Sequence, residues 1–246
     1  PICCYMSPKI SDIILLGTDR IHLFDTPLLM CRNQGLSMEQ RAAKRVLDII
    51  VSGLGIIVSS PIMLIIAIAV KAYDGGPVFY LQDRLTYQGK EFRIRKFRSM
   101  CVDSEKNGAR LASKHDSRIT PVGHVLRNLH LDELPQLFNV FMGDMSLVGP
   151  RPERDVIMQE YEQEIPEFHY RLKVKAGLTG YAQVYGKYNT TPYDKLKLDL
   201  FYIENYSFLL DIKLLFMTVK IFFQKEVSEG VDDNQKNALK DSEDKK

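Results

Sequence analysis

The 246-residue chain contains no tryptophan, has four cysteines and carries a formal net charge of only +2. A balanced charge argues against a general nucleic-acid-binding protein, which needs a broad basic surface. No two cysteines have the spacing of a zinc site, and the adjacent Cys3 and Cys4 are poorly placed for a disulfide. We therefore expect reduced thiols in a cytosolic setting and no nucleic-acid partner.

The first residues lack the basic, apolar and small-residue order of a signal peptide. The chain starts at Pro1, so either an initiator Met was removed or this is the C-terminal part of a longer protein. Residues 1–36 form a short unit that is too small for a core of its own. Within it, residues 10–16 are a candidate strand ended by Gly17. We expect this unit to be the remnant of an N-terminal accessory region.

The most prominent feature present is an uncharged run of 22 residues, 49–70, interrupted by Ser60 and Pro61. It is the only segment long enough to enter a bilayer deeply. A helix over residues 47–60 would be about 21 Å long, which is short of the ~30 Å hydrocarbon core. Pro61 should kink the helix, and the neighbouring serine hydroxyls can bond the carbonyls that the kink frees.

Basic residues flank this run on both sides, and positive flanks prefer the cytoplasmic face of a membrane. Two flanks on one face favour a re-entrant hairpin that dips into the bilayer and returns, with its kink at Ser60 and Pro61. A kinked span and a buried helix of a soluble protein remain alternatives. The flanking cations are Arg41, Lys44 and Arg45 before the run, and Lys71 and Arg84 after it.

Short periodic segments on both sides of the run predict a mostly helical α+β fold. Ser37 and Gln40 have the spacing of a capping box, so a basic helix should lead into the run. Short strands are expected over residues 78–81 and 92–97, around a turn at Gly89. Residues 103–118 look like a loop, and residues 119–129 like a turn and a short helix.

The second half of the chain predicts further helices. Leu134, Leu137, Phe138 and Phe141 have amphipathic spacing, and Pro135 is tolerated only in a first turn, so this helix should start near residues 131–133. Residues 154–172 look helical and acidic. Residues 206–223 suit either a helix in the membrane interface or a core helix, and residues 224–246 look like a disordered charged tail.

Asp132 and Glu133 lie at the expected start of that helix, where the helix dipole favours negative charge and should keep both ionised. Acids at helix starts are commonly caps, but three features suggest chemistry instead. Arg127 lies five residues upstream, Lys96 and Arg98 add cations, and Arg151 stands between two prolines that stiffen its backbone. Carboxylates beside arginines and a lysine, without a Ser or Cys nucleophile pattern, suggest a Mg²⁺-dependent phosphoryl site.

Six motifs in one order make a specific resemblance. The sequence over residues 40–223 resembles the bacterial sugar transferase family, the monotopic polyprenyl-phosphate phosphoglycosyl transferases. Residues 1–36 resemble the end of the extra N-terminal region of larger members. The motifs are Lys44-Arg45 before the apolar run, Gly-Pro-Val-Phe (76–79), Lys-Phe-Arg-Ser-Met (96–100), Leu-Asp-Glu-Leu-Pro-Gln-Leu (131–137), Ser-Leu-Val-Gly-Pro-Arg-Pro-Glu (146–153) and Gly-Leu-Thr-Gly (177–180).

The resemblance implies transfer of a sugar-1-phosphate from a UDP-sugar to undecaprenyl phosphate, with release of UMP. It implies that Asp132 attacks the sugar-bearing phosphorus and that Glu133 helps to hold Mg²⁺. It also implies substrate or phosphate contacts for further residues, with Asp199 a weaker candidate that could only stabilise the fold. These residues are Arg127, Arg151, Lys96, Arg98, Asp199, and Gln183 with Tyr185 after the Gly-Leu-Thr-Gly turn.

These expectations divide the chain into the accessory remnant 1–36, a basic helix with the membrane hairpin 37–72, a catalytic domain 73–223 and the tail 224–246. The implied location is the bacterial inner membrane, with the catalytic domain on its cytoplasmic face in contact with lipid. A homodimer is compatible with the sequence. Two other functions are weighed against the transferase: an inactive membrane adaptor of the same fold, and a Mg²⁺-dependent hydrolase of nucleotide sugars.

Overall fold

The structure is a computed structural model, and it describes most of the chain between residues 8 and 222. The predicted tail 224–246 and most of the predicted loop 103–118 lie outside the described residues. The described residues are 8–16, 18–23, 26–31, 36–102, 116–186 and 190–222.

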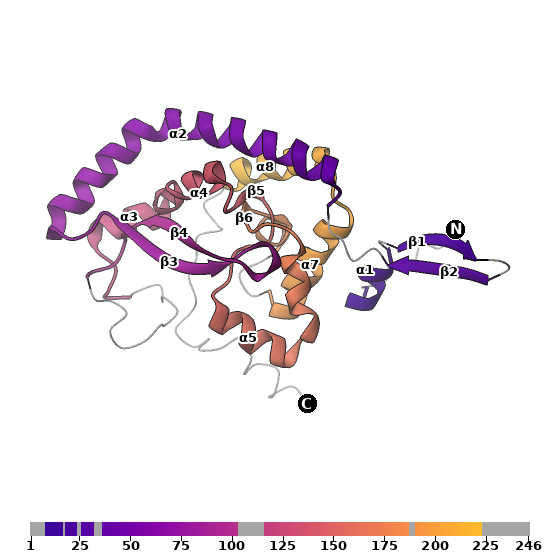
Figure 1. Cartoon of the computed structure of the whole chain (residues 1–246). Coiled ribbons are helices and arrows are strands. Elements are labelled where there is room, and N and C mark those ends of the chain that lie inside the picture. Colours follow the sequence, from indigo (N-terminus) through magenta and orange to yellow (C-terminus); the bar gives the residue numbers. More distant parts are fainter. Residues whose placement is uncertain are drawn as a thin grey trace, which may run out of the picture.

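The long apolar run forms the middle of one helix, α2 (Met38–Asp74), which arches over the rest of the molecule (Figure 1). The predicted capping box is confirmed: the Ser37 hydroxyl accepts the Gln40 amide at 3.2 Å, and the Gln40 side chain accepts the Ser37 amide at 2.8 Å. Gly75 ends the helix with φ 70°, a conformation that glycine adopts without strain. Pro61 lies inside the helix, and the chain remains helical on both sides of it.

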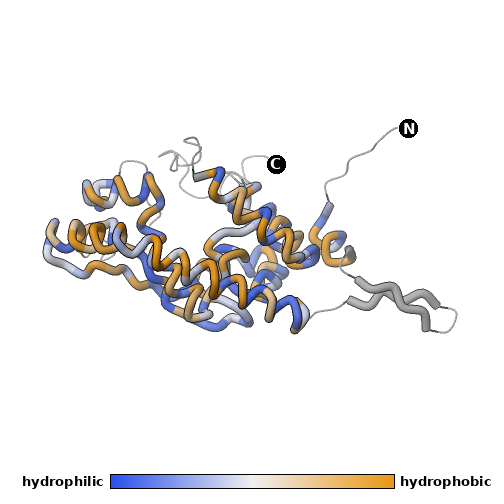
Figure 2. The backbone as a smooth tube through the Cα atoms, turned by 90° about the horizontal axis from the view of Figure 1, so that it is seen from above, coloured by the Kyte–Doolittle hydropathy of each residue, from blue (hydrophilic) through white to orange (hydrophobic). Residues whose placement is uncertain are grey.

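Only one side of α2 packs against protein. Gly53 and Gly55 let the helix α4 (Gln136–Met142) approach closely, because a Cβ at Gly55 would lie 3.2 Å from the side chain of Leu137. Only 17% of the most apolar 18-residue stretch of α2 is buried, and α2 is the one helix in the described chain that is long and apolar enough to cross a membrane. Figure 2, which views the molecule from the α2 side, shows hydrophobic residues along this helix.

This exposure argues against the alternative of a soluble core helix, because large apolar side chains are unfavourable in water. The apolar side chains of α2 that are more than half exposed include Ile50, Leu54, Ile57, Val58, Leu64, Ile65 and Ile68.

The two strands predicted around Gly89 form an antiparallel hairpin. Strand β3 (Phe79–Leu85) pairs with β4 (Glu91–Phe97), with Phe79 opposite Phe97. The strands are joined by a 3-10 turn, η1 (Tyr87–Gly89), and Gly89 has φ 75°. Strand β3 extends to Leu85, four residues beyond the predicted end at residue 81. Leu85 itself is buried in the core.

A second group of elements lies between the hairpin and α2. Helix α3 (Pro121–Asn128) is followed by a 3-10 turn, η2 (Leu131–Glu133), and then by α4, which ends at Gly143 with φ 95°. The Arg45 guanidinium of α2 donates to the carbonyls of Val140 and Phe141, both at 2.7 Å, and so satisfies the end of α4.

The remaining elements build the core beneath α2. The short strands β5 (Ser146–Val148) and β6 (Gly177–Thr179) pair in parallel. Helix α8 buries Leu214 completely but leaves Leu209 and Phe216 about three-quarters exposed, so its placement in a membrane interface stays a prediction. The other elements are α5 (Asp155–Glu164), η3 (Pro166–Lys173), α6 (Tyr181–Tyr185), α7 (Pro192–Glu204) and α8 (Phe208–Phe222).

The N-terminal unit differs from expectation. Residues 10–16 form a helix, α1 (Ile10–Leu16), and the predicted strand is wrong. Ile10 and Ile13 lie one turn apart and are both buried in the main core, next to α7. Tertiary packing therefore decided the conformation of a short apolar run that local pattern leaves ambiguous. A hairpin of β1 (Thr18–Leu23) and β2 (Thr26–Cys31) follows and projects from the rest of the molecule (Figure 1).

Candidate functional site

Asp132 and Glu133 lie in the 3-10 turn η2, three residues before α4 begins. The predicted α-helical start at residues 131–133 is therefore wrong by about one turn. Pro135 explains the difference, because it has no N–H to donate to the carbonyl of Leu131. The Leu134 amide bonds Leu131 instead, in the tighter i to i+3 pattern. The turn projects both acids from the short connection between α3 and α4.

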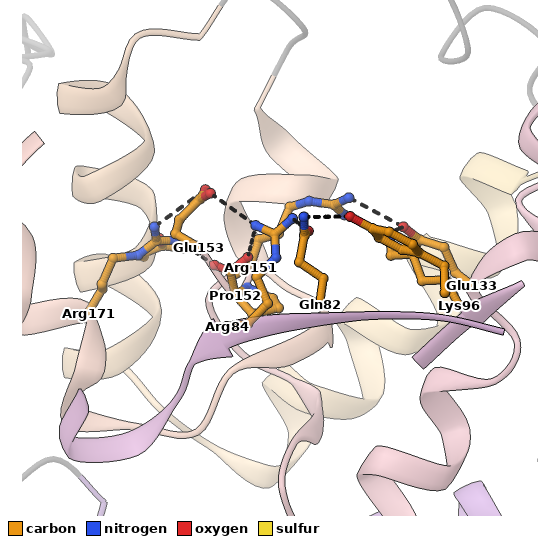
Figure 3. A network of polar contacts seen from close by, with 10 residues as sticks. Gln82, Arg84, Lys96, Glu133, Arg151, Pro152, Glu153 and Arg171 are labelled. Atoms are coloured by element: carbon orange, nitrogen blue, oxygen red, sulfur yellow. Dashed lines mark hydrogen bonds and ion pairs between the residues drawn. The ribbon is translucent and has the colours of Figure 1, made fainter. Parts of the chain in front are cut away.

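Glu133 is held by two cations. The Lys96 ammonium on β4 lies 2.6 Å from the Glu133 Oε1 atom, and the Arg151 guanidinium lies 3.3 Å from the same atom (Figure 3). Burial raises the pKa of Glu133, but Arg151 and Lys96 outweigh it and lower the pKa to about 2. Glu133 is therefore an ionised carboxylate at any physiological pH.

Asp132 has a different environment from its neighbour. Burial raises the pKa of Asp132, the Glu133 charge adds to that effect, and the charges of Lys96 and Arg127 oppose it. No ion pair involves Asp132 in the part of the chain that the structure describes. Adjacent carboxyls whose pKa values are pushed apart are typical of sites that give the two groups different roles.

Arg127 reaches this turn from α3. Its Nε atom donates to the Ser99 hydroxyl at 2.8 Å, and burial lowers its pKa while the charge of Asp132 raises it. The guanidinium is therefore fixed beside Asp132 by a neutral partner, which leaves its charge available to a substrate.

Arg151 follows β5 on a rigid loop. The Gly149 amide bonds the Thr179 carbonyl at 2.8 Å, and the Gly177 amide bonds the Pro150 carbonyl at 2.9 Å. A Cβ on Gly149 would collide with the Lys175 carbonyl, so the two backbone segments approach each other closely at this glycine. Glu133 raises the pKa of Arg151. The loop thus presents a permanently charged planar donor to the two carboxylates.

Residues 39–225 match the family described as "Bacterial sugar transferase". The chain belongs to this family.

Three curated relatives illustrate the similarity to other bacterial sugar transferases. A UDP-N-acetylgalactosamine-undecaprenyl-phosphate N-acetylgalactosaminephosphotransferase of Aeromonas hydrophila is 44% identical over 72% of this chain and 43% of its own length. A UDP-glucose:undecaprenyl-phosphate glucose-1-phosphate transferase of Klebsiella pneumoniae is 43% identical over 82% of this chain and 43% of its own. An undecaprenyl-phosphate galactose phosphotransferase of Salmonella typhimurium is 36% identical over 89% of this chain and 49% of its own length. The chain spans about half the length of these relatives.

The bacterial sugar transferase site includes two arginines, Arg84 and Arg171, that were not among the site residues predicted from the sequence. The Arg171 guanidinium donates to the Arg151 carbonyl at 3.0 Å and lies 3.7 Å from Glu153. Arg84 lies 3.8 Å from Glu153 and donates to the Pro152 carbonyl at 3.2 Å (Figure 3). These two arginines lie 87 positions apart in the sequence, so only the fold shows that both contact the segment that carries Arg151.

Three predicted site residues have other partners. Asp199 is 1% exposed and lies 2.8 Å from Arg171, a position that suits the fold-stabilising alternative; burial raises its pKa to about 6 despite the charge of Arg171. Arg98 pairs with Asp74 at the end of α2. Gln183 donates to the Leu178 carbonyl at 3.3 Å. Within the described residues, no hydrogen bond or ion pair joins these three side chains directly to Asp132 or Glu133.

The residues at this site fit only one mode of magnesium binding. No group of three or more His, Cys, Asp or Glu side chains in the described ranges could enclose a metal. Mg²⁺ is commonly held by one or two carboxylates together with substrate phosphates rather than by an all-protein cage. Asp132 and Glu133 are adjacent carboxylates of that sort, so the site suits an ion that arrives with a diphosphate.

Proposed function

We propose that this protein transfers a sugar-1-phosphate from a UDP-sugar to undecaprenyl phosphate and releases UMP. The observation that carries the proposal is the pairing of two adjacent carboxylates: Asp132, which has no ion-pair partner among the described residues, and Glu133, which contacts Lys96 and Arg151. The names of the three relatives describe phosphotransferases that use undecaprenyl phosphate, which supports the same reaction here.

In the first step, a carboxylate oxygen of Asp132 attacks the phosphorus that bears the sugar. The bond from this phosphorus to the bridging oxygen of the diphosphate breaks, and UMP leaves with that oxygen. The product is a phosphosugar-aspartate, an acyl phosphate. A covalent step of this kind divides one difficult transfer between two large substrates into two simpler displacements.

In the second step, a phosphate oxygen of undecaprenyl phosphate attacks the same phosphorus, and the Asp132 carboxylate departs unchanged. One phosphoanhydride bond is lost and one is formed, so the reaction needs no ATP. The raised pKa of Asp132 makes its ionised form a more basic nucleophile, while Arg127 and Arg151 stabilise the negative charge on the transferred group.

Glu133 would hold Mg²⁺ against the donor diphosphate. When bound there, the ion would neutralise phosphate charge and orient the diphosphate. Lys96 fixes the Glu133 side chain from β4, so that the carboxylate is oriented before substrate binds.

In this proposal, the apolar helix α2 holds the reaction at the membrane surface. The proposal is that α2 enters the cytoplasmic leaflet of the bacterial inner membrane as a re-entrant element, with Ser60 and Pro61 at its bend. Both halves of α2 contact the catalytic domain: Val51 packs against its main core, and Met63 and Ile66 pack beside Phe97. A helix held on one domain at both ends keeps that domain at the headgroup layer, where the lipid phosphate lies.

The decisive experiment measures UMP release by the purified protein in detergent or nanodiscs, with undecaprenyl phosphate and a panel of UDP-sugars. Release that depends on the lipid phosphate supports transfer, whereas release without it indicates hydrolysis. Asp132→Asn should lower kcat by at least about a thousandfold, because the nucleophile is lost. Without the lipid acceptor, mass spectrometry of the wild type should detect a phosphosugar adduct on the peptide that contains Asp132. A fully active Asp132→Asn protein would contradict the proposal.

The panel also identifies the donor sugar, since the names of the three relatives include N-acetylgalactosamine, glucose and galactose. A lipid diphosphate sugar is the starting unit on which further glycosyl transfers build a chain. The proposed place of this enzyme is accordingly the first membrane step in the assembly of an exopolysaccharide, capsule, O-antigen or related glycoconjugate.

A further inference from the structure

A small pocket is lined in part by Lys96 and Arg151, the two cations that contact Glu133. It is open to solvent, and the space inside it, counted together with the adjoining solvent, is about 260 Å³. Its charged lining residues are Arg84, Lys96 and Arg151, and no carboxylate is among the lining residues. The full lining is Arg84, Ile94, Lys96, Gln136, Arg151, Pro152, Gly177 and Leu178.

Gln136 contributes an unpaired donor to this pocket. Its side chain is only 3% exposed, and its Nε2 atom is buried without a hydrogen-bond partner in the described structure. A buried amide without a partner is unfavourable, because it lost its hydrogen bonds to water on folding. Native proteins retain few such groups, and each one calls for an explanation, such as a catalytic role or a bound water or ion.

Arg84 contributes a second unpaired donor to the pocket. Its Nη1 atom donates to the Pro152 carbonyl at 3.2 Å and its Nη2 atom to Gln82 at 2.6 Å, whereas its Nε atom is buried and has no partner within the described residues. The first two bonds fix the plane of the guanidinium (Figure 3). The remaining N–H is therefore oriented before any ligand arrives.

The lining thus combines three cations with two unsatisfied buried donors. A ligand that satisfies all of them must be an anion with several acceptor oxygens, and a phosphate ester has this chemistry. An apolar or cationic ligand would leave the donors unpaired. Lys96 and Arg151 also contact Glu133, so an anion in this pocket lies directly beside the proposed reaction centre.

We propose that Gln136 and Arg84 form a phosphate-binding subsite that receives a phosphate oxyanion of one of the two substrates. This inference rests on the proposed function, and it deepens it by naming two residues that no other argument above assigns to the substrate. The phosphate belongs either to the nucleotide that leaves or to the lipid acceptor.

The test is equilibrium binding, which needs no turnover. Isothermal titration calorimetry on the full chain in detergent would measure the affinity for UMP and, separately, for a short-chain prenyl phosphate. Gln136→Met keeps the length of the side chain but removes the donor, and it should weaken the ligand that uses this subsite by roughly tenfold. Gln136→Glu places a negative charge against the phosphate and should weaken that ligand further. Gln159→Glu, an exposed position on α5, introduces the same charge elsewhere and should leave both affinities unchanged.

A second measurement separates ligand binding from a structural role. Without ligand, Gln136→Met should have a melting temperature equal to or above that of the wild type, because the variant no longer buries an unpaired amide. A residue needed only for folding would instead lower the melting temperature and leave the affinity unaltered.

Each binding result either assigns the subsite to one of the two ligands or rejects it. Loss of UMP affinity assigns the subsite to the nucleotide, and loss of prenyl phosphate affinity assigns it to the acceptor. Unchanged affinity for both ligands in Gln136→Met, or no binding of either ligand by the wild type, overturns the subsite. Binding that depends on Gln136 in a protein that transfers no sugar phosphate would preserve the subsite and reject the proposed reaction.

Discussion

The Lys44 ammonium on α2 lies 2.6 Å from the Asp211 carboxylate on α8, and both side chains are almost completely buried. The Tyr202 hydroxyl accepts from Lys44 at 3.1 Å and donates to Asp211 at 2.7 Å. This buried ion pair joins the start of the apolar helix to the last described helix of the catalytic domain. The ion pair thus fixes the position of α2 relative to the helices that surround the candidate site.

Replacing one member of this pair should be strongly destabilising. Asp211→Asn would remove the carboxylate that contacts the buried Lys44 ammonium and would leave Asp48 as the remaining opposite charge nearby. The expected loss is roughly 3–5 kcal/mol in the free energy of unfolding. Thermal unfolding of the purified protein in detergent measures it. The double variant Lys44→Met/Asp211→Leu removes both charges and should recover most of the loss. A double variant that is less stable than Asp211→Asn would contradict this account.

The proline inside α2 gives a second prediction, which concerns Ser60 and Pro61. Pro61 has no N–H to donate to the Ile57 carbonyl, and the Ser60 hydroxyl donates to that carbonyl at 2.9 Å instead. Ser60→Ala should therefore leave a carbonyl unpaired in an apolar setting, at a cost of about 1–3 kcal/mol. Pro61→Ala should straighten the helix and restore the missing backbone bond.

The test is a double-mutant cycle read by thermal unfolding in nanodiscs. In the Pro61→Ala background, Ser60→Ala should cost much less than it does alone, because the backbone then satisfies Ile57. Ser59→Ala is the matched control, since Ser59 donates to the Gly55 carbonyl, which the missing N–H of Pro61 does not affect. Cysteine labelling of both flanks of α2 tests the topology: labels on opposite membrane faces would reject the re-entrant arrangement.

The third prediction concerns the pH dependence of stability at Glu133. Arg151 and Lys96 overcome the effect of burial and lower its pKa from 4.5 to about 2. A lowered carboxyl pKa stabilises the folded state fully above the unfolded value of 4.5, and that stabilisation is lost as the pH falls from 4.5 towards 2. At pH 3.5 the contribution should be roughly 1 kcal/mol smaller than at pH 7.

Glu133→Gln has no such titration and serves as the reference. The stability advantage of the wild type over this variant should be larger at pH 7 than at pH 3.5, as measured by unfolding at both values. An advantage that grows as the pH falls would show that the two cations do not hold the carboxylate in its charged form.

Several elements of the fold follow from local pattern alone. The capping box at Ser37 and the turn at Gly89 were both predicted from short-range rules, because each depends on residues a few positions apart. Two predictions failed where local rules compete. Residues 10–16 suit a strand or a helix equally, and their burial against the core decided for a helix. The turn at Asp132 is 3-10 because Pro135 removes one α-helical bond.

By itself, the sequence determined that this chain carries one deeply apolar segment and an Asp-Glu pair within the motifs of a sugar transferase, since these features are contiguous in the chain. Only the tertiary structure decided which cations contact Glu133, that Lys44 contacts Asp211, and that Gln136 and Arg84, each with an unpaired buried donor, line one pocket. These residues lie far apart along the chain, with Lys44 and Asp211 separated by 167 positions. Such contacts depend on how whole elements pack, which no local periodicity encodes.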